Sequence, residues 1–478
     1  MIVPLRCSLL TSFRISNTCL GDPNLGFFIV PCFITVSKLL IKALLELSKT
    51  PDSRSQSWTD PLASDGGKQL WKLGSFLEDA TDRIREGFTK CLTDRSGSSG
   101  FGKHATPEGK RKGIYQAGSL CLKLLLHGRK VSSMTTIFSS VDAQAPLLSH
   151  FPAAQRVTYL YYLGRYHFAN NHFYRAQLAL QAAYDQCHVQ ALQHRRLILV
   201  YLIASNMCLG RFPSTMLLQR EEAAEAREHF FPLIAYIRTG NLAEFKNFLN
   251  LGNLHADWFL GKRMLFQMRN RCEPLVWRSL ARRVFLDVGF RGEDNKTPFF
   301  RLYFLQAAAQ WMNQRTLDSL QGNQDEEASD SEFEGMESAI AESGFDMDSG
   351  IYAEPVGQSA ESSVSLTTSA SSREPQPTLE EIESIMASLI QQDLLQGFLT
   401  HNNPRFAIPG AKTKGALAVG FPPVWGVIRG RHASKEVPGW VKEDVSTNAL
   451  GGNMFGSSFG GGGPFFMGDR RPFGAVAG

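Results

Sequence analysis

The chain has 478 residues, 43% of them hydrophobic, and a formal net charge of +5 at pH 7. This length allows two or three domains, and the composition is ordinary for a globular protein. The charge is unevenly distributed, because no Lys or Arg lies between Arg315 and Arg373. The remaining chain is therefore distinctly basic, which favours nucleic acid or an acidic protein as a partner.

The eight cysteines are scattered along the chain, and no two of them form a C-x-x-C pair. Several lie on apolar helix faces, so we expect reduced core thiols in a cytosolic or nuclear protein. Cys187 and His188 lie close to His194 in the sequence, but this spacing matches no zinc finger. We therefore expect no metal and no cofactor.

Residues 1–107 are expected to be partly helical and partly disordered. The apolar run Phe27–Leu47 is interrupted by Pro31 and by charged residues, so its uninterrupted part is too short to span a membrane. We expect a buried or partner-facing helix from about Ser37, preceded by a flexible start. A mitochondrial presequence is the alternative, because no acidic residue precedes Asp22.

Three further patterns precede residue 113. Apolar residues at steps of three and four predict an amphipathic helix over Lys68–Leu92. Gly97–Lys103 reads G-S-S-G-F-G-K, like a phosphate-binding loop, but His104 stands where such a loop has its magnesium-holding hydroxyl. A solvated linker is the better interpretation. The basic run Lys110–Lys112 is either an import signal or a solvated helix start.

The stretch Phe151–Ser214 is the longest part of the chain with helical apolar spacing. It matches a tetratricopeptide-type hairpin, in which small residues let two antiparallel helices approach closely. Gly164 and Ala176 are those small residues, and the turn Ala169–Phe173 separates the two helices. A third helix, Ala191–Leu209, is apolar on nearly all sides and should be buried.

Residues 260–286 form a basic helical segment with seven cations and one acid, Glu273. Pro274 is expected in the first turn of a helix on which Val276, Leu280 and Val284 form an apolar stripe. A solvated helix face with a few ion pairs is the alternative. The excess of cations favours a surface for phosphates or for an acidic partner. The cations are Lys262, Arg263, Arg269, Arg271, Arg278, Arg282 and Arg283.

The C-terminal part predicts a winged helix. Phe299–Gln314 is an aromatic-rich helix, and Thr378 with Glu381 forms a capping box that opens a second helix. Two strand-like runs, Gly397–Thr400 and Arg405–Ile408, follow around an Asn-Asn-Pro turn. Helix, helix and hairpin in this order are typical of a winged helix.

Two C-terminal segments are expected to lack a fixed structure. Residues 321–377 are acidic, rich in Ser and Gly and without periodicity, which indicates a disordered insertion. Ser329 and Ser331 lie there among acidic residues and are candidate phosphorylation sites. Residues 424–478, with a few Phe-Gly steps, are expected to be a flexible Gly/Phe-rich tail.

Several segments resemble the PCI-domain proteins of one branch. That branch contains the PCI subunit of the second TREX (transcription-export) complex and the similar protein named as twelfth subunit of the COP-nine signalosome. The resemblance starts near residue 108, and the acidic insertion and the stretch after Pro423 depart from it. It rests on Ala154–Arg165, Arg195–Ser214, the Gly240-Asn241 turn, W-R-S-L-A-R-R-V at Trp277–Val284, Gly397–Leu399 with His401, and Phe421-Pro422.

The resemblance implies an all-α, TPR-like helical-repeat solenoid followed by a C-terminal winged helix. Residues 108–298 would form the helical repeats, and residues 299–320 with 378–423 the winged helix. It also implies a larger PCI scaffold protein and a small acidic protein as partners, and RNA or DNA bound without sequence preference. Arg405, Lys412 and Lys414 around the wing would join the basic helix in contacting phosphates.

We consider three classes of function for this chain. The favoured class is a non-enzymatic scaffold of a transcription-coupled mRNA export complex in the nucleus, at the nuclear pore, with some protein in the cytoplasm. The helix Tyr159–Arg165 and the basic segment fit this branch better. The alternative is a signalosome-associated interaction subunit with little nucleic-acid contact. An enzyme is disfavoured, because the sequence has no complete phosphate loop, no metal-spaced His or Cys set and no nucleophile elbow.

Overall fold

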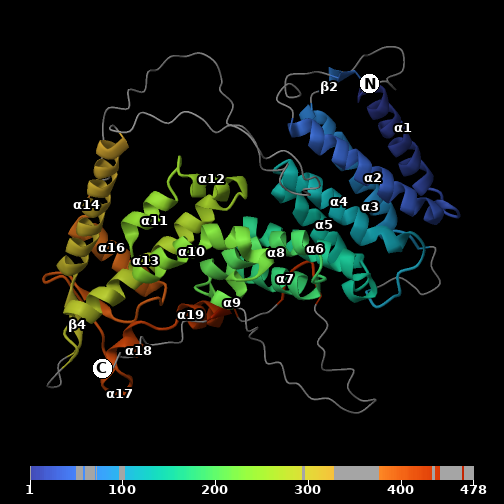
Figure 1. Ribbon diagram of the computed structural model, residues 1–478. Coiled ribbons are helices and arrows are strands. Elements are labelled where there is room, and N and C mark those ends of the chain that lie inside the picture. Colours follow the sequence, from blue (N-terminus) through green and yellow to red (C-terminus); the bar gives the residue numbers. More distant parts are fainter. Residues whose placement is uncertain are drawn as a thin grey trace. The chain divides into compact units, whose positions relative to one another are not determined.

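The computed structural model describes residues 2–49, 58–59, 70–71, 73–95, 103–292, 297–327, 376–432, 436–441 and 466–467. The chain divides into two compact units. The first contains the described residues up to Leu202 together with residues 436–441. The second contains the described residues from Ile203 to 432 together with residues 466–467. Figure 1 shows that helices dominate both units, and the predicted helical solenoid with a C-terminal winged helix is confirmed.

The described residues of the first unit are mainly helical. Its elements are α1 (Ile2–Leu20), α2 (Gly26–Lys49), β1 (Trp58–Thr59), β2 (Leu70–Trp71), α3 (Leu73–Leu92), the 3-10 turn η2 (Gly109–Gly113), α4 (Ile114–His127), α5 (Val131–Gln144), η3 (Leu148–His150), α6 (Ala153–Ala169), α7 (Phe173–Gln186) and the start of α8 (Leu192–Cys208).

The N-terminal residues are more ordered than predicted. The expected flexible start is wrong, because α1 and α2 are both helical and α2 continues through Pro31. Its part Gly26–Glu46 is long and apolar enough to cross a membrane by length and composition alone. Within the unit, however, α2 packs against α1, α3 and α4 and buries Phe33 and Leu44. It is therefore a core helix of this unit.

The basic run at residues 110–112 is not a solvated helix start. It forms η2, in which the side chains of Lys110 and Arg111 are buried. The Arg111 guanidinium donates a hydrogen bond to the backbone oxygen of Gln144 at 2.7 Å. Burial lowers the pKa of Arg111. Most of the predicted linker Gly97–Lys103 lies outside the described part of the chain, and the described Lys103 is half-buried, with its carbonyl accepting a hydrogen bond from the Leu147 amide at 2.8 Å.

The predicted hairpin of α6 and α7 is confirmed. A Cβ atom on Gly164 would lie 2.4 Å from Cγ of Leu180, so only glycine lets the two helices approach this closely. The turn between them uses Asn171 at φ 60°, in the left-handed region that Asn tolerates. Arg165 is buried in the same unit, where its guanidinium stacks 3.8 Å from the ring centre of Tyr201.

Part of the predicted flexible tail is structured. Val424–Arg431 forms the helix α19 in the second unit. Residues 436–441 belong to the first unit, where the Tyr159 hydroxyl donates a hydrogen bond to the Gly439 carbonyl at 2.6 Å. The Pro438 carbonyl lies 3.3 Å from Nε2 of His167. Most of the remaining tail lies outside the described residues.

Acid is expected to weaken the first unit through His167. Burial lowers its pKa to about 4, and the positive charge of Arg175 and the neighbour His172 act in the same direction. The folded value lies below the ordinary value of 6.5, so the unfolded chain binds the proton more readily. Neutral His167 makes its full contribution to the free energy of unfolding above about pH 6.5, and this contribution is lost as the pH falls towards 4. Urea unfolding should show that the free energy of unfolding decreases by up to about 3 kcal/mol across this window. The decrease should be smaller in His167→Gln.

The second unit contains further solenoid helices and the winged helix. Its elements are the end of α8, β3 (Phe212–Pro213), α9 (Thr215–Leu218), η4 (Glu221–Ala223), α10 (Ala224–Thr239), α11 (Leu242–Phe248), α12 (Leu254–Gly261), α13 (Leu265–Val288), β4 (Phe299–Arg301), α14 (Leu302–Glu327), α16 (Leu379–Gln391), β5 (Phe398–Thr400), β6 (Arg405–Ala407), α17 (Ala411–Lys414), α18 (Ala416–Gly420), α19 and β7 (Phe466–Met467).

The solenoid helices α10 and α11 are joined at Gly240, as the sequence predicts. Gly240 has φ +73° and ends α10, and the Asn241 side chain accepts a hydrogen bond from the Glu244 amide to start α11. The close neighbour of Gly240 is the α13 backbone at Leu280. In contrast, Pro274 lies in the interior of α13 and not in its first turn.

The winged helix has the order α13, β4, α14, α16, β5, β6. Its antiparallel sheet has the strand order β4-β6-β5, with Phe300 and Leu399 both paired to Phe406. The predicted hairpin and the Thr378–Glu381 capping box are confirmed. The prediction of a helix starting at Phe299 is wrong by three residues, because Phe299–Arg301 is the first strand. α14 also extends to Glu327, into the predicted disordered insertion.

Four phenylalanines from separate segments form the core of this module. The ring centres of Phe300 and Phe406 are 5.6 Å apart, and those of Phe285 and Phe421 are 5.8 Å apart. Each buried phenylalanine stabilises the fold by about 1.5 to 3 kcal/mol. This shared core joins α13 and the sheet to the segment that follows α18.

Candidate nucleic-acid and partner interface

Arg278, the central cation of the predicted basic surface, is buried. Only 5% of this residue is exposed. Its Nε donates to the Leu394 carbonyl at 3.1 Å, and Nη2 donates to the carbonyls of Phe421 at 3.1 Å and Pro422 at 2.6 Å. The expectation that Arg278 contacts phosphates is therefore corrected. The guanidinium ties α13 to the segments after α16 and α18.

Lys262 and Arg263 form the turn between α12 and α13. The Lys262 ammonium lies 3.3 Å from a carboxylate oxygen of Glu225 on α10, and it lies 5.6 Å from the ring centre of Trp258. Arg263 has φ 56°, and its backbone amide donates to the Leu260 carbonyl at 2.8 Å. An adjacent anion neutralises Lys262, so this pair adds little to a phosphate-binding surface.

The other four cations of α13 are more accessible. Arg271 and Arg283 are exposed, whereas Arg269 and Arg282 are half-buried. Arg283 also donates a hydrogen bond to the Thr239 carbonyl at 3.1 Å, in an exposed position. This bond leaves the rest of the guanidinium in contact with solvent. α13 thus retains one exposed cation in each half of the helix.

The cations around the wing differ in their environment. Arg405, on β6, is half-buried, and its guanidinium lies 4.8 Å from the ring centre of Phe299 on β4. Lys414 is exposed at the end of α17. The Lys412 side chain lies outside the described residues, as do Ser329 and Ser331. Of the two predicted wing cations whose side chains the structure describes, Lys414 is therefore the exposed one.

The winged helix also exposes aromatic side chains that the sequence interpretation did not single out. Leu302, Leu305 and Ala309 form the buried stripe of α14, while Tyr303 and Trp311 lie outside it and are exposed, Trp311 to 60%. The Arg315 guanidinium lies 5.3 Å from the ring centre of Trp311. The sequence of α14 contains more aromatic residues than its single buried apolar stripe can hold. This excess was the sequence signal that some of them lie on the surface.

The hairpin adds an exposed edge to this surface. Phe398 is exposed on β5, and β5 is an outer strand of the three-stranded sheet. An outer strand offers backbone amides and carbonyls on one side. A partner could therefore contact both the backbone and an aromatic side chain here. Alternation along β5 supports this arrangement, because Phe398 and Thr400 are exposed while Leu399 is half-buried.

The described part of the chain contains no candidate metal site, and five of its seven free cysteines are buried as expected, whereas Cys19 and Cys32 are exposed. No group of three or more His, Cys, Asp or Glu there could hold a metal ion. Cys208 and Cys272 are buried free thiols, as predicted for core cysteines. A hydrogen bond with Cys208, together with burial, raises the pKa of Cys272 well above its ordinary value. Its thiol therefore stays protonated and unreactive near neutral pH.

Comparison with known proteins connects this architecture to named relatives. No family model matches the chain. A PCI domain-containing protein of Schizosaccharomyces pombe is 29% identical over 275 residues, which is 57% of each chain. A protein named CSN12 homolog of Neurospora crassa is 31% identical over 224 residues, 46% of each chain. PCI domain-containing protein 2 of Danio rerio is 24% identical over 214 residues, 45% of this chain and 50% of the relative. The chain spans about half the length of the curated relatives it matches.

Proposed function

Since the chain is a PCI-domain protein of the branch that contains the CSN12 homologues and PCI domain-containing protein 2, we propose that it is a scaffold subunit of a nuclear mRNA export complex. One observation carries the proposal: a helical solenoid leads directly into a winged helix that exposes both cations and aromatic side chains. PCI-domain proteins are generally non-catalytic scaffolds. The site of action under this proposal is the nucleus, at the nuclear pore.

The proposed main partner is a larger PCI scaffold protein that docks beside the winged helix. Three features support this assignment: the outer strand β5, exposed Phe398 on it, and exposed Tyr303 and Trp311 on α14. Aromatic side chains of this kind contribute strongly to interfaces, because they bury a large apolar area at low conformational entropy. A small acidic protein is the second proposed partner, recruited by the basic character of the folded chain.

The proposed nucleic-acid contact is electrostatic and independent of sequence. Exposed Arg271, Arg283 and Lys414 are suited to contact phosphates of RNA or DNA, and the same unit also carries half-buried Arg269, Arg282 and Arg405. Arg278 has no part in it, because its donors are directed to backbone carbonyls. This contact should weaken as salt rises.

Reversing two exposed charges tests this surface. The double variant Arg271→Glu with Arg283→Glu should bind single-stranded RNA at least about tenfold more weakly, and the slope of log K against log salt should fall by about 2. Fluorescence anisotropy over a range of salt concentrations measures both quantities. The matched control reverses two exposed cations of the other unit, Arg95 and Arg129, with the same change in net charge. Equal losses in both double variants would show that net charge, and not this surface, is responsible.

A second candidate is a signalosome-associated interaction subunit with little nucleic-acid contact. The names of three relatives favour it, because proteins of Neurospora crassa, Gibberella zeae and Mycosarcoma maydis carry the name CSN12 homolog. Purification of the tagged chain followed by identification of its partners separates the two. A large PCI scaffold supports the export proposal, whereas a signalosome assembly without that scaffold contradicts it.

A further inference from the structure

A short segment near the C-terminus forms a tight turn within the first unit. The Trp440 amide donates to the Val437 carbonyl at 2.9 Å, and the two residues form an antiparallel bridge. Pro438 and Gly439 occupy the central positions, with φ of Gly439 at +92°. Pro followed by Gly at positive φ is the signature of a type II turn. The turn is therefore encoded locally in the sequence Val-Pro-Gly-Trp.

Helix α6 receives this turn with two buried polar groups. The Tyr159 hydroxyl donates to the Gly439 carbonyl at 2.6 Å, and Nε2 of His167 lies 3.3 Å from the Pro438 carbonyl. Tyr159 and His167 are themselves almost fully buried. A buried donor that lacks an acceptor costs about 1 to 3 kcal/mol, so this face of the helix is complementary to a peptide backbone.

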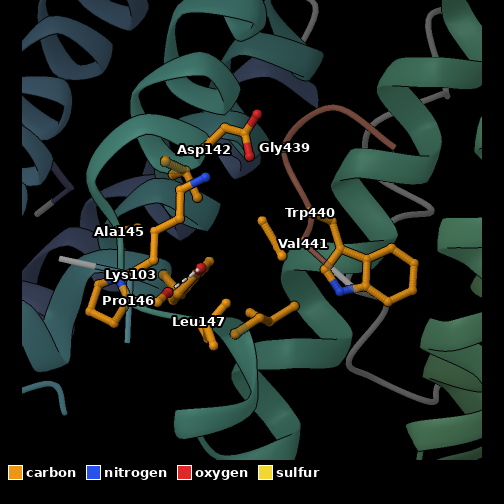
Figure 2. Close-up of a pocket in the computed structure, with 11 residues that line it drawn as sticks. Lys103, Asp142, Ala145, Pro146, Leu147, Gly439, Trp440 and Val441 are labelled. Carbon is orange, nitrogen blue, oxygen red and sulfur yellow. Dashed lines mark hydrogen bonds between the residues drawn. The ribbon is translucent and has the colours of Figure 1, made fainter. Parts of the chain in front are cut away.

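The fit around the turn is selective for glycine. A Cβ atom on Gly439 would lie 3.1 Å from Cδ1 of Leu163 on α6 and 3.3 Å from Phe138 on α5. Val437 is buried and Trp440 is half-buried. Figure 2 shows the segment Gly439–Val441 passing along a pocket that Asp142 and Leu147 also line. Trp440, the aromatic residue after the glycine, therefore lines this pocket.

We propose that the α5–α6 face is a peptide-recognition site for a Pro-Gly turn followed by an aromatic residue, and that its ligand is this chain's own segment Val437–Trp440. The Tyr159 and His167 contacts to the two carbonyls recognise the turn backbone. The positive φ of Gly439 and the closeness of Leu163 and Phe138 disfavour other residues at the glycine. The site goes beyond the scaffold function proposed above. Because the ligand is tethered, its effective concentration is high, and a free peptide competes poorly against it.

Binding of a free peptide tests the proposal. The probe is a fluorescent peptide with the sequence of residues 436–441, and the receptor is the full chain carrying Gly439→Val, in which the tethered turn is strained and crowded. This variant should bind the peptide at least about tenfold more tightly than the unaltered chain. Adding Tyr159→Phe to the variant should weaken binding about three- to tenfold, the effect of one lost hydrogen bond. A peptide with Val in place of its glycine should not bind.

Equal binding of the peptide to the unaltered chain and to Gly439→Val overturns the proposal, as does binding that Tyr159→Phe leaves unchanged. Hydrogen exchange in the unaltered full chain supplies a measurement that does not depend on how the variant folds. The Trp440 amide should exchange at least about tenfold more slowly than in the free peptide, because it is bonded to Val437 in a docked turn. Exchange at the rate of the free peptide contradicts a docked segment.

Discussion

Replacing Arg278 with alanine is expected to destabilise the winged-helix unit by about 3 to 5 kcal/mol. The guanidinium donates to three backbone carbonyls that are buried with it, those of Leu394, Phe421 and Pro422. Each buried acceptor that loses a charged donor costs about 1 to 3 kcal/mol. Urea unfolding of the full chain, followed by the fluorescence of its tryptophans, measures the loss.

Two control substitutions separate burial from charge. Arg283→Ala removes a cation from the same helix, but its one hydrogen bond, to the Thr239 carbonyl, is exposed, so the expected loss is within about 0.5 kcal/mol. Arg278→Lys keeps the charge but loses the planar fork of donors, so we expect an intermediate loss. If Arg278→Ala unfolds at the same urea concentration as Arg283→Ala, the proposed anchor does not exist.

Gly240→Ala is expected to destabilise the junction of α10, α11 and α13 by about 3 kcal/mol. Its φ of +73° is unfavourable for any residue with a Cβ atom, by about 1 to 2 kcal/mol. In addition, the new Cβ atom would lie 2.6 Å from the Leu280 amide nitrogen and 2.7 Å from its Cα atom. Because these are backbone atoms of α13, they cannot move away without displacing the helix, which adds about 1 to 3 kcal/mol.

Gly252 provides the matched control for this prediction. It also has a positive φ, +98°, but nothing lies within 4 Å of the position of its Cβ atom. Gly252→Ala should therefore show the backbone strain alone, about 1 to 2 kcal/mol. Thermal unfolding of both variants gives the difference due to crowding. Equal losses would mean that α13 does not approach Gly240 as closely as the structure shows.

These two residues also explain why the basic segment behaves differently from its sequence interpretation. Arg278 belongs to the motif Trp277–Val284 that resembles the family, and its side chain stabilises the winged helix instead of facing a ligand. Leu280, two residues later, packs against Gly240. The motif therefore contains residues of structural importance, and the exposed cations of α13 are Arg271, which precedes the motif, and Arg283, near its end.

Local patterns in the sequence determined most of the helices and one hairpin. Examples are the apolar steps of three and four in α4 and α6, the capping box at Thr378 and the glycine at position 164. Each of these patterns results from an interaction within one helical turn or between adjacent helices. Such short-range interactions leave a periodic or positional pattern, so the sequence alone predicts them.

Only the tertiary structure determined which charged and polar groups are exposed to a partner and which are buried in internal hydrogen bonds. Arg278 reaches the Leu394 carbonyl 116 residues away, and Tyr159 reaches the Gly439 carbonyl 280 residues away. The strand β4 likewise exists because residues about a hundred positions later pair with it. Contacts over such separations leave no periodic pattern, since the acceptor is a backbone carbonyl that every residue carries. Local sequence patterns therefore determined the helical solenoid and its helical hairpin. Only the tertiary structure determined that Arg278 is buried as a structural anchor and that the tail segment Val437–Trp440 lies against α6.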